Sequence, residues 1–293
     1  MVQAELLSAR NPRVRRLRRL AGRRSARLGE QRFVIEGPLL ITEALDAGVD
    51  VEEIFVDAAD ARRPNVTTML ASAAGRQVPV ALLARGALEQ VADAATPNAA
   101  IAVARRRPAA VSEVLESAIR RARLVLVMAG VSDPGNAGTL IRAAAAAGTV
   151  GVVACGGTDV FGPKAVRASA GAVFRVPVAE VPAPRDATRT NGAATGDEPS
   201  DPVGALASVM AACRDRGVAV VVADQQGEPF TTATLTEPLA LVVGNESHGV
   251  PAVTIAQADR VVSIPMENEV ESLNVAMAGT VLCFEVARRR WGK

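Results

Sequence analysis

Aromatic side chains are scarce in this chain of 293 residues, since Phe, Tyr and Trp together make up 2% of it and tyrosine is absent. Proteins that bind single-stranded nucleic acid commonly stack the bases on such rings. The composition therefore argues against a protein that reads a single-stranded sequence. Any contact with RNA is expected to rely on arginine side chains and backbone groups.

Cysteines and long apolar runs are also lacking. The three cysteines, Cys155, Cys213 and Cys283, do not have the close spacing of a zinc site or a disulfide framework, so we expect a reducing compartment and no metal. No stretch is apolar over the roughly 20 residues that a membrane-spanning helix needs. The first 20 residues are rich in arginine where a secretion signal would be apolar. These absences predict a cytoplasmic protein that does not contact a membrane.

What the chain has instead is a hydrophobic content of 49% and a length sufficient for two domains with buried cores. The net charge of +2 is small, but arginine is unevenly distributed. Residues 8–32 contain Arg10, Arg13, Arg15, Arg16, Arg18, Arg19, Arg23, Arg24, Arg27 and Arg32, with few acids among them.

This basic stretch is expected to form a helix, because Val14, Leu17 and Leu20 recur at helical spacing and leave the arginines around one thin apolar seam. It is either a solvated helix face or a surface that binds RNA phosphates. We favour phosphate binding because few acids oppose the arginines, and we name Arg10, Arg13 and Arg16 as candidate RNA contacts.

Strands and helices alternate in the first hundred residues. Strands are predicted at 33–36, 51–56, 78–82 and 101–104, with helices over 39–45 and 67–74 between them. This pattern predicts a small α/β domain over residues 1–105. Arg105-Arg106-Arg107-Pro108 marks a boundary, and a linker helix is expected within 106–122.

A second domain is predicted over 123–293. Buried strands are expected at 124–128, 150–154, 218–223 and 239–243, as in a parallel sheet. The glycine-rich turn from Asp133 to Thr139 then leads into a helix that ends at Gly148. A dinucleotide site is disfavoured there, because the G-x-G-x-x-G spacing is missing and no acid closes the next strand. Residues 182–204 are polar without apolar periodicity, which predicts a mobile loop insertion.

The last part of the chain combines three features. A strand ends at Ile264-Pro265, a polar loop covers 266–271, and Ser272 stands where a helix N-cap is expected. The following helix has small and apolar residues at helical spacing, and three arginines from Arg288 to Arg290 close it at the end that favours cations. A polar loop is therefore expected between a buried strand and a buried helix.

Three segments resemble signature motifs of the SpoU/TrmH family of RNA 2'-O-ribose methyltransferases, which belongs to the SPOUT superfamily. They are DPGNAGTLIRAAAAAG from Asp133, VVGNESHGV from Val242, and IPM with ESLNVA from Ile264. The resemblance implies a parallel α/β domain with a deep C-terminal trefoil knot. The first half similarly resembles the α/β/α substrate-binding domain of some family members, although Pro97-Asn98-Ala99 replaces the usual Pro-Gln-Gly.

The family's activity implies that S-adenosyl-L-methionine is the cofactor and that RNA is the substrate, and the additional N-terminal domain favours ribosomal RNA over transfer RNA. It also implies a homodimer that forms through the knot region. Residue by residue, the motifs carry over five catalytic positions, Asn136, Arg142, Glu246, Ser272 and Asn274. They also carry over five cofactor-binding positions, Gly244, Asn245, Ile264, Met266 and Leu273.

The role of Arg142 needs a physical argument, because a guanidinium group does not readily lose its proton in proteins. We therefore expect Arg142 to hold the ribose 2'-oxygen or a neighbouring phosphate and to stabilise negative charge. Asp133 stands where the family usually has Asn, which adds a negative charge beside this site.

Other readings stay open. Lys164 and Arg167 share a helix face and form either a phosphate clamp or an exposed basic face. His248 is the only histidine, but it lies outside the positions that the family motif transfers, so catalysis by it is disfavoured. A tRNA methyltransferase and an RNA-binding protein without catalytic activity remain the alternative functions.

Overall fold

A computed structural model describes residues 6–91, 99–182, 203–268 and 270–292. Most of the predicted 182–204 insertion, together with Pro97 and Asn98, lies outside these residues. The described chain forms two compact units. Unit 1 holds the residues up to Arg107 and the segment Phe161–Phe174, and unit 2 holds Pro108–Val160 and the chain from Arg175 onward.

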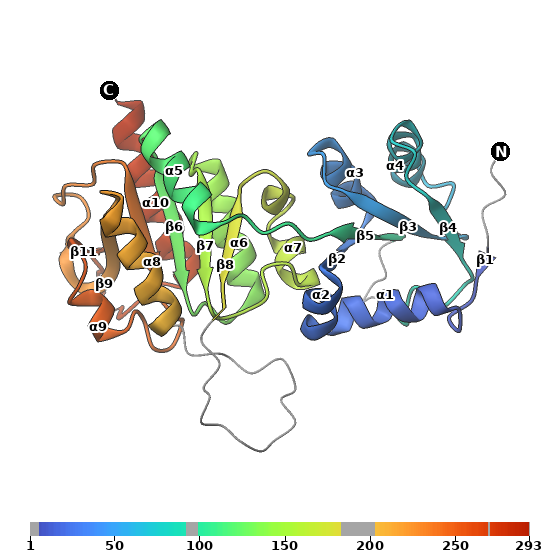
Figure 1. Cartoon of the computed structure of the whole chain (residues 1–293), viewed down its shortest axis with the longest axis horizontal. Helices are drawn as coiled ribbons and strands as arrows, with labels where there is room; N and C mark the ends of the chain where they lie inside the picture. The colour runs from blue at the N-terminus through green and yellow to red at the C-terminus, as the bar shows by residue number, and fades with distance from the viewer. Residues whose placement is uncertain (1–5, 92–98, 183–202, 269, 293) are drawn as a thin grey trace, which may run out of the picture. The chain divides into compact units, whose positions relative to one another are not determined.

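The sheet of unit 1 has the strand order β1-β4-β3-β5-β2. Strands β1 (Leu6–Leu7), β4 (Val80–Leu83) and β3 (Val51–Asp57) are parallel, and β5 (Ala100–Arg105) is antiparallel to both β3 and β2 (Arg32–Glu36). Helices α3 (Pro38–Asp46) and α4 (Pro64–Gly75) lie on one side, and α1 (Pro12–Gly22) and α2 (Arg24–Glu30) on the other (Figure 1). The expected three-layer α/β/α domain is confirmed.

Helix α1 forms where the apolar seam predicted it. Val14, Leu17 and Leu20 are buried and pack with sheet residues such as Val34 and Phe55. Asn11 starts the helix, because its side-chain oxygen accepts a hydrogen bond from the Arg13 N–H at 2.9 Å and Pro12 needs no partner for its nitrogen. The seam thus fixes which side of the helix faces the core.

The segment 161–174 packs in unit 1 although its sequence neighbours belong to unit 2. It contains α7 (Pro163–Ala168) and a short 3-10 helix at Ala172–Phe174. The Phe161 ring meets Phe33 of β2 edge-to-face, with 5.4 Å between centroids, and Arg167 forms an ion pair with the buried Glu36. Aromatic packing and charge therefore attach this segment to β2.

Unit 2 has a six-stranded sheet in which all neighbours are parallel, in the order β11-β9-β10-β6-β7-β8. The strands are β6 (Leu124–Ala129), β7 (Gly151–Cys155), β8 (Val178–Val181), β9 (Ala219–Pro229), β10 (Leu239–Val243) and β11 (Arg260–Ser263). The predicted parallel sheet is confirmed. Strand β9 is longer than expected, because it continues past a register shift to pair with the end of β11.

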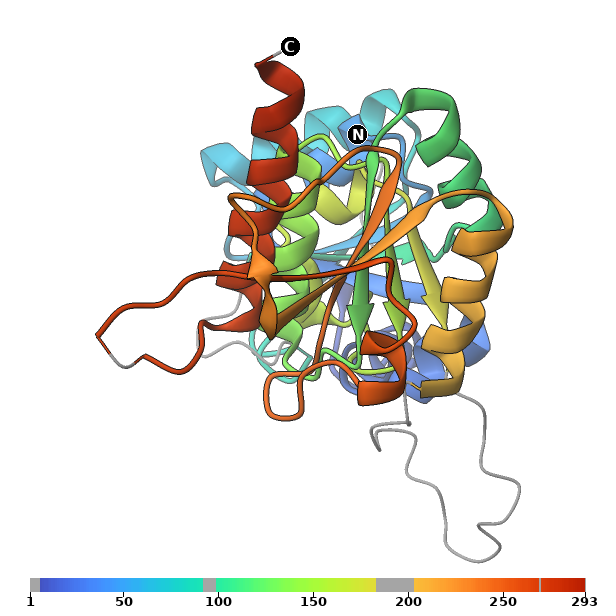
Figure 2. The ribbon, with the colours of Figure 1, turned by 90° about the vertical axis from the view of Figure 1, so that its left-hand side faces the viewer.

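Helices cover both faces of this sheet (Figure 2). One side carries α5 (Val111–Arg121), α8 (Val203–Asp215) and the short α9 (Ala252–Ile255), and the other carries α6 (Pro134–Ala146) and α10 (Val275–Trp291). The helix expected as a linker is α5, and its Val114, Leu115 and Ala118 lie in the hydrophobic core of unit 2.

Helix α10 packs on α6 at its small residues, where a Cβ on Gly279 would collide with Leu140. Arg289 and Arg290 fasten its last turn, because they donate to the carbonyl oxygens of Phe230 and Ala147 at 2.6 and 2.8 Å. Within the described residues, no helix is long and apolar enough to cross a membrane. The same residues contain no cluster of three or more His, Cys, Asp or Glu side chains that could hold a metal ion.

Candidate active site

The three motif segments leave the unit 2 sheet at one edge. Strands β6, β10 and β11 run parallel within the sheet, so their carboxyl ends lie at the same edge. The chain continues from these ends into residues 130–133, 244–250 and 264–274. In open parallel α/β sheets, ligands bind at this carboxyl edge.

Glu246 joins the first two segments. Its carboxylate accepts hydrogen bonds from the Ser132 N–H and Oγ at 3.0 and 2.8 Å, from the Asp133 N–H at 3.0 Å and from Asn136 Nδ2 at 2.9 Å. Desolvation alone would raise its pKa, but these donors together lower the pKa of Glu246 to about 2. Glu246 is therefore ionised at neutral pH and acts as a hydrogen-bond acceptor that aligns the start of α6.

Asn136 carries the network on to the third segment. Its Oδ1 accepts from Asn274 Nδ2 at 3.0 Å, and Asn274 Oδ1 accepts from the N–H groups of Ala276 and Met277 at 2.8 and 3.3 Å. The N-cap of α10 is thus Asn274, and the expectation that Ser272 caps this helix was wrong. Asn136 lies inside α6, whose N-cap is Asp133, and not in the turn before the helix.

The turn after β10 is closed by its own backbone. The N–H of Asn245 donates to Gly249 O at 3.0 Å, and the N–H of Gly249 donates to Asn245 O at 2.9 Å. Asn245 Nδ2 donates to Gly130 O at 2.8 Å, which ties this turn to the end of β6. Gly244 has no room for a Cβ, because one would collide with backbone atoms of Gly249 and Val250.

His248 lies in this turn, with its Nδ1 3.1 Å from Asn245 Oδ1. That oxygen already accepts from the N–H groups of Ser247 and His248, so Nδ1 must carry the proton. This contact ties the ring to its own turn, and a part of His248 in catalysis stays disfavoured.

Of the five predicted catalytic residues, the network connects Asn136, Glu246 and Asn274. Arg142 is exposed on α6 and Ser272 is exposed before α10, and neither forms a hydrogen bond or an ion pair within the described residues. Their catalytic roles stay predictions.

Two protein-family models match this chain. A model described as the SpoU rRNA Methylase family matches residues 123–198 and 193–284, and one described as an MRM3-like substrate binding domain matches residues 11–102. The chain belongs to the SpoU rRNA methylase family.

Relatives match nearly the whole SpoU chain. The 23S rRNA (guanosine(2553)-2'-O)-methyltransferase RlmP of Bacillus subtilis is 31% identical over 284 residues, which is 96% of this chain and 98% of RlmP. The 23S rRNA (guanosine-2'-O-)-methyltransferase RlmB of Bordetella pertussis is 34% identical over 254 residues, which is 83% of this chain and 91% of RlmB. The crystal structure of the SpoU methyltransferase AviRb from Streptomyces viridochromogenes with the cofactor AdoMet aligns with a TM-score of 0.78 and 27% identity, covering 96% of this chain and 99% of AviRb.

The side chains at the predicted cofactor positions suit such a ligand. Ile264, Met266 and Leu273 follow β11, and each is neither fully buried nor fully exposed. Partly exposed apolar side chains beside backbone N–H and C=O groups suit a neutral purine ring. The residues of this SpoU protein therefore fit S-adenosylmethionine, with Gly244 and Asn245 supplying the adjoining turn.

The contribution of Ser132 and the capping role of Asp133 were not recognised from the sequence. Ser132 supplies two of the donors to Glu246, and the Asp133 side chain accepts from the Asn136 N–H at 2.9 Å as the cap of α6. An Asp followed by Pro at the start of a helix is a capping signal, so Asp133 could have been found. Its carboxylate keeps the capping function that an Asn at this position would have.

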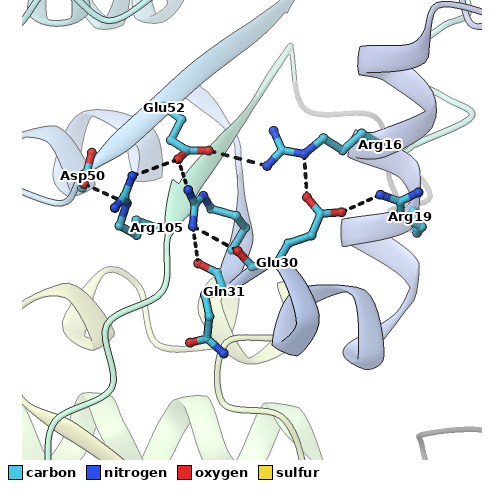
Figure 3. A network of polar contacts seen from close by, with 8 residues as sticks. Arg16, Arg19, Glu30, Gln31, Asp50, Glu52 and Arg105 are labelled. Atoms are coloured by element: carbon cyan, nitrogen blue, oxygen red, sulfur yellow. Dashed lines mark hydrogen bonds and ion pairs between the residues drawn. The ribbon is translucent and has the colours of Figure 1, made fainter.

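The predicted RNA-binding arginines differ in their surroundings. Arg10 is exposed, whereas Arg13 pairs with Glu53, and Arg16 pairs with Glu30 at 2.6 Å (Figure 3 shows Arg16). On α7, Lys164 is exposed and Arg167 pairs with Glu36. Since α7 packs in unit 1, these two residues lie in the substrate-binding unit of the SpoU chain.

Proposed function

We propose that this protein methylates a ribose 2'-hydroxyl in 23S ribosomal RNA with S-adenosylmethionine as the methyl donor. The observation that carries this proposal is the Glu246–Asn136–Asn274 network, because it ties all three family motifs together at the carboxyl edge of the sheet. The substrate follows from the relatives, whose activities are 23S rRNA 2'-O-methylation. A ribosomal RNA substrate also supports a cytoplasmic location for the protein.

The cofactor supplies a methyl group bonded to a positively charged sulfur, which is a good leaving group. The new bond between the ribose oxygen and the methyl carbon forms as the bond from carbon to sulfur breaks, and the hydroxyl proton is lost to water. The protein must hold the oxygen in line with that methyl group and stabilise the negative charge that develops as the proton leaves. We assign Ile264, Met266, Leu273 and the backbone of Gly244 and Asn245 to cofactor binding. Arg142 would hold the oxygen or an adjacent phosphate, and Ser272 and Asn274 would orient the ribose.

A deletion of the gene tests the proposal. We expect one nucleotide of 23S rRNA to lose its 2'-O-methyl group in the deletion strain, as measured by mapping 2'-O-methylation in total RNA. The wild-type gene should restore the mark. In single-turnover methylation of a 23S rRNA transcript, Arg142→Ala should react at about 1% of the wild-type rate or less, because removing one preorganised charge-stabilising donor costs roughly 100-fold or more in rate, while Arg142→Lys should react faster than Arg142→Ala because it keeps the positive charge.

Two results would contradict the proposed function, and a third would change the role assigned to Arg142. Loss of a methyl group only in tRNA would favour the alternative substrate, and no change in either RNA would favour a binding protein without catalytic activity. Equal loss of activity in Arg142→Lys and Arg142→Ala with unchanged RNA binding would exclude positioning by charge alone.

The same proposal includes a homodimer and the trefoil knot of the family. The small residue Gly279 of α10 faces α6 of the same chain, where an added Cβ would collide with Leu140. The opposite face of α10 exposes Met277, Val281, Phe284 and Trp291 at helical spacing, and the Phe284 and Trp291 rings lie 6.3 Å apart. An apolar helix face of this kind suits burial against a second copy.

Phe284→Glu is expected to convert the dimer to monomers, because it would bury an unpaired carboxylate in an apolar interface. The dissociation constant of the dimer should rise about 100-fold, corresponding to roughly 3 kcal/mol. Sedimentation equilibrium measures this constant. Val253→Glu, at an exposed apolar residue of α9 that is 52% exposed, is the control and should leave the dimer intact. A dimer that survives Phe284→Glu would place the interface elsewhere.

A further inference from the structure

Two groups can be distinguished among the arginines of the basic stretch in unit 1, besides the buried Arg27, which donates to the carbonyl oxygens of Leu20 and Ala21. One group is bound to carboxylates of the same unit. The other is exposed and forms no ion pair within the described residues; it consists of Arg10, Arg15, Arg18 and Arg23. The sequence does not distinguish these groups, because both lie in one run of like charge.

Arg13 pairs with Glu53, and the other bound arginines, Arg16, Arg19 and Arg32, belong to a continuous network of ion pairs (Figure 3 labels Arg16 and Arg19). Glu30 of α2 accepts from Arg16 at 2.6 Å and from Arg19 at 2.5 Å. Glu52 of β3 lies 2.5 Å from Arg32 and 3.6 Å from Arg16. The network therefore links α1, α2, β2 and β3.

The same network extends to the end of β5. Arg105 lies 3.2 Å from Asp50 and 3.6 Å from Glu52, and Arg107 lies 2.9 Å from Asp50. The pKa of Glu30 is lowered by Arg19 and Arg16 against its desolvation, and hydrogen bonding to Arg32 is the largest cause that lowers the pKa of Glu52. These carboxylates are thus held in their ionised form, as partners of the arginines.

The two groups alternate along α1. Arg13, Arg16 and Arg19 recur every three residues, and all three have acidic partners. Arg15 and Arg18 are also three residues apart, are exposed, and form no ion pair within the described residues. The helix therefore carries neutralised arginines and arginines with uncompensated positive charge.

This difference decides which arginines suit a phosphate. An arginine that is already bound to a carboxylate would have to break that pair, and the released carboxylate would then repel the RNA backbone. An unpaired exposed arginine exchanges only water and counterions for the phosphate. The bound arginines are better suited to holding α1 and α2 on the sheet.

We propose that Arg15 and Arg18, with Arg10 before α1 and Arg23 after it, contact the phosphates of the RNA substrate, and that Arg13 and Arg16 position the helix. This inference rests on the proposed function only for the identity of the RNA. It differs from the sequence-based selection in replacing Arg13 and Arg16 as contacts, and it keeps Arg10.

Two double variants of the full-length protein test the proposal, because each removes two positive charges from the same helix. They are Arg15→Gln with Arg18→Gln, and Arg13→Gln with Arg16→Gln. The probe is an in vitro transcript of the host 23S rRNA, with its binding constant measured at several KCl concentrations. The midpoint of thermal unfolding is measured for each protein.

For the Arg15/Arg18 variant, we expect the slope of log K against log[KCl] to fall by about 1.4–1.8, since each lost phosphate contact removes about 0.7–0.9. Affinity near 0.1 M KCl should fall roughly 25- to 60-fold, with an unchanged melting temperature. For the Arg13/Arg16 variant, we expect a lower melting temperature and an unchanged slope. Equal slopes in the two variants, or the reverse order, would overturn the proposal.

If the Arg13/Arg16 variant does not fold, the single variants Arg16→Gln and Arg15→Gln give the same comparison with half the change in slope. Methyl transfer by the wild-type protein is assayed separately. A protein that transfers no methyl group but still shows the difference in slope would refute the proposed function and leave this inference standing. A protein that transfers methyl groups but shows no difference in slope between the two variants would refute this inference and leave the proposed function standing.

Discussion

Glu246→Gln is expected to lower the rate of methyl transfer about 100-fold, although Gln has nearly the same shape as Glu. Oε1 of Glu246 accepts from the Asp133 N–H and Asn136 Nδ2, and Oε2 accepts from the N–H and hydroxyl of Ser132 and, at 3.4 Å, from Asn245 Nδ2. A glutamine amide has one oxygen, so its NH₂ group would face at least two of these donors. Leaving a donor unpaired costs about 1–3 kcal/mol, and a loss of roughly 2.7 kcal/mol is a factor of 100.

The substitution is expected to change the structure only locally. Asn136 would turn away from residue 246 and lose its hydrogen bond with Asn274. Single-turnover methylation of a 23S rRNA transcript measures the rate, and calorimetry with S-adenosylmethionine measures cofactor binding. Glu116→Gln removes the same charge from an exposed position on α5 and should leave both unchanged. A Glu246→Gln protein as active as the wild type would show that the network does not organise the reaction.

Where apolar periodicity dominates, the sequence was sufficient to predict the structure. The seam of Val14, Leu17 and Leu20 predicted α1, and the uninterrupted apolar run at 239–243 predicted a strand that is buried on both faces. These elements form because their apolar side chains are buried, and the spacing of apolar residues in the sequence indicates which positions those are.

The start of α10 shows where local signals were insufficient. Ser272 and Asn274 are both good N-cap residues, and they stand two positions apart. Asn274 is the cap because its amide is also held by Asn136, which lies 138 residues earlier in the chain. A tertiary hydrogen bond therefore selected between two equivalent local signals.

Pairing of charges could not be predicted for the same reason. The partners of Arg13 and Arg16 include Glu53 and Glu52 of β3, which only the folded sheet brings beside α1. Similarly, Arg167 meets Glu36 because the segment 161–174 packs in unit 1 despite lying in the sequence between β7 and β8 of unit 2. The run of arginines indicated a basic helix, and the fold determines which of its charges remain available.

Gly244→Ala is expected to abolish cofactor binding and to destabilise unit 2, because the added methyl group has no space. A Cβ at this position would lie well inside 3.0 Å of the Gly249 carbonyl carbon and oxygen and of the Val250 nitrogen. All three are backbone atoms, so no side-chain rotation can relieve the collision. Overpacking of this kind costs about 1–3 kcal/mol, and occasionally more.

The displacement would reach the active site through the turn itself. The turn is closed by the two hydrogen bonds between Asn245 and Gly249, and it carries Glu246 against Ser132 and Asp133. An outward shift of Gly249 therefore moves the Glu246 carboxylate away from its donors on Ser132 and Asp133. The melting temperature of the protein and calorimetric titration with S-adenosylmethionine measure the two effects.

Gly75→Ala is the matched control for this substitution. Gly75 ends α4, and a Cβ there meets nothing within 4 Å. Since alanine favours a helix over glycine by up to about 1 kcal/mol, this variant should be as stable as the wild type or slightly more stable, with cofactor affinity unchanged. If Gly244→Ala instead bound the cofactor with wild-type affinity, the 244–250 turn would not form part of the cofactor site, and the assignment of Gly244 and Asn245 to that site would be wrong.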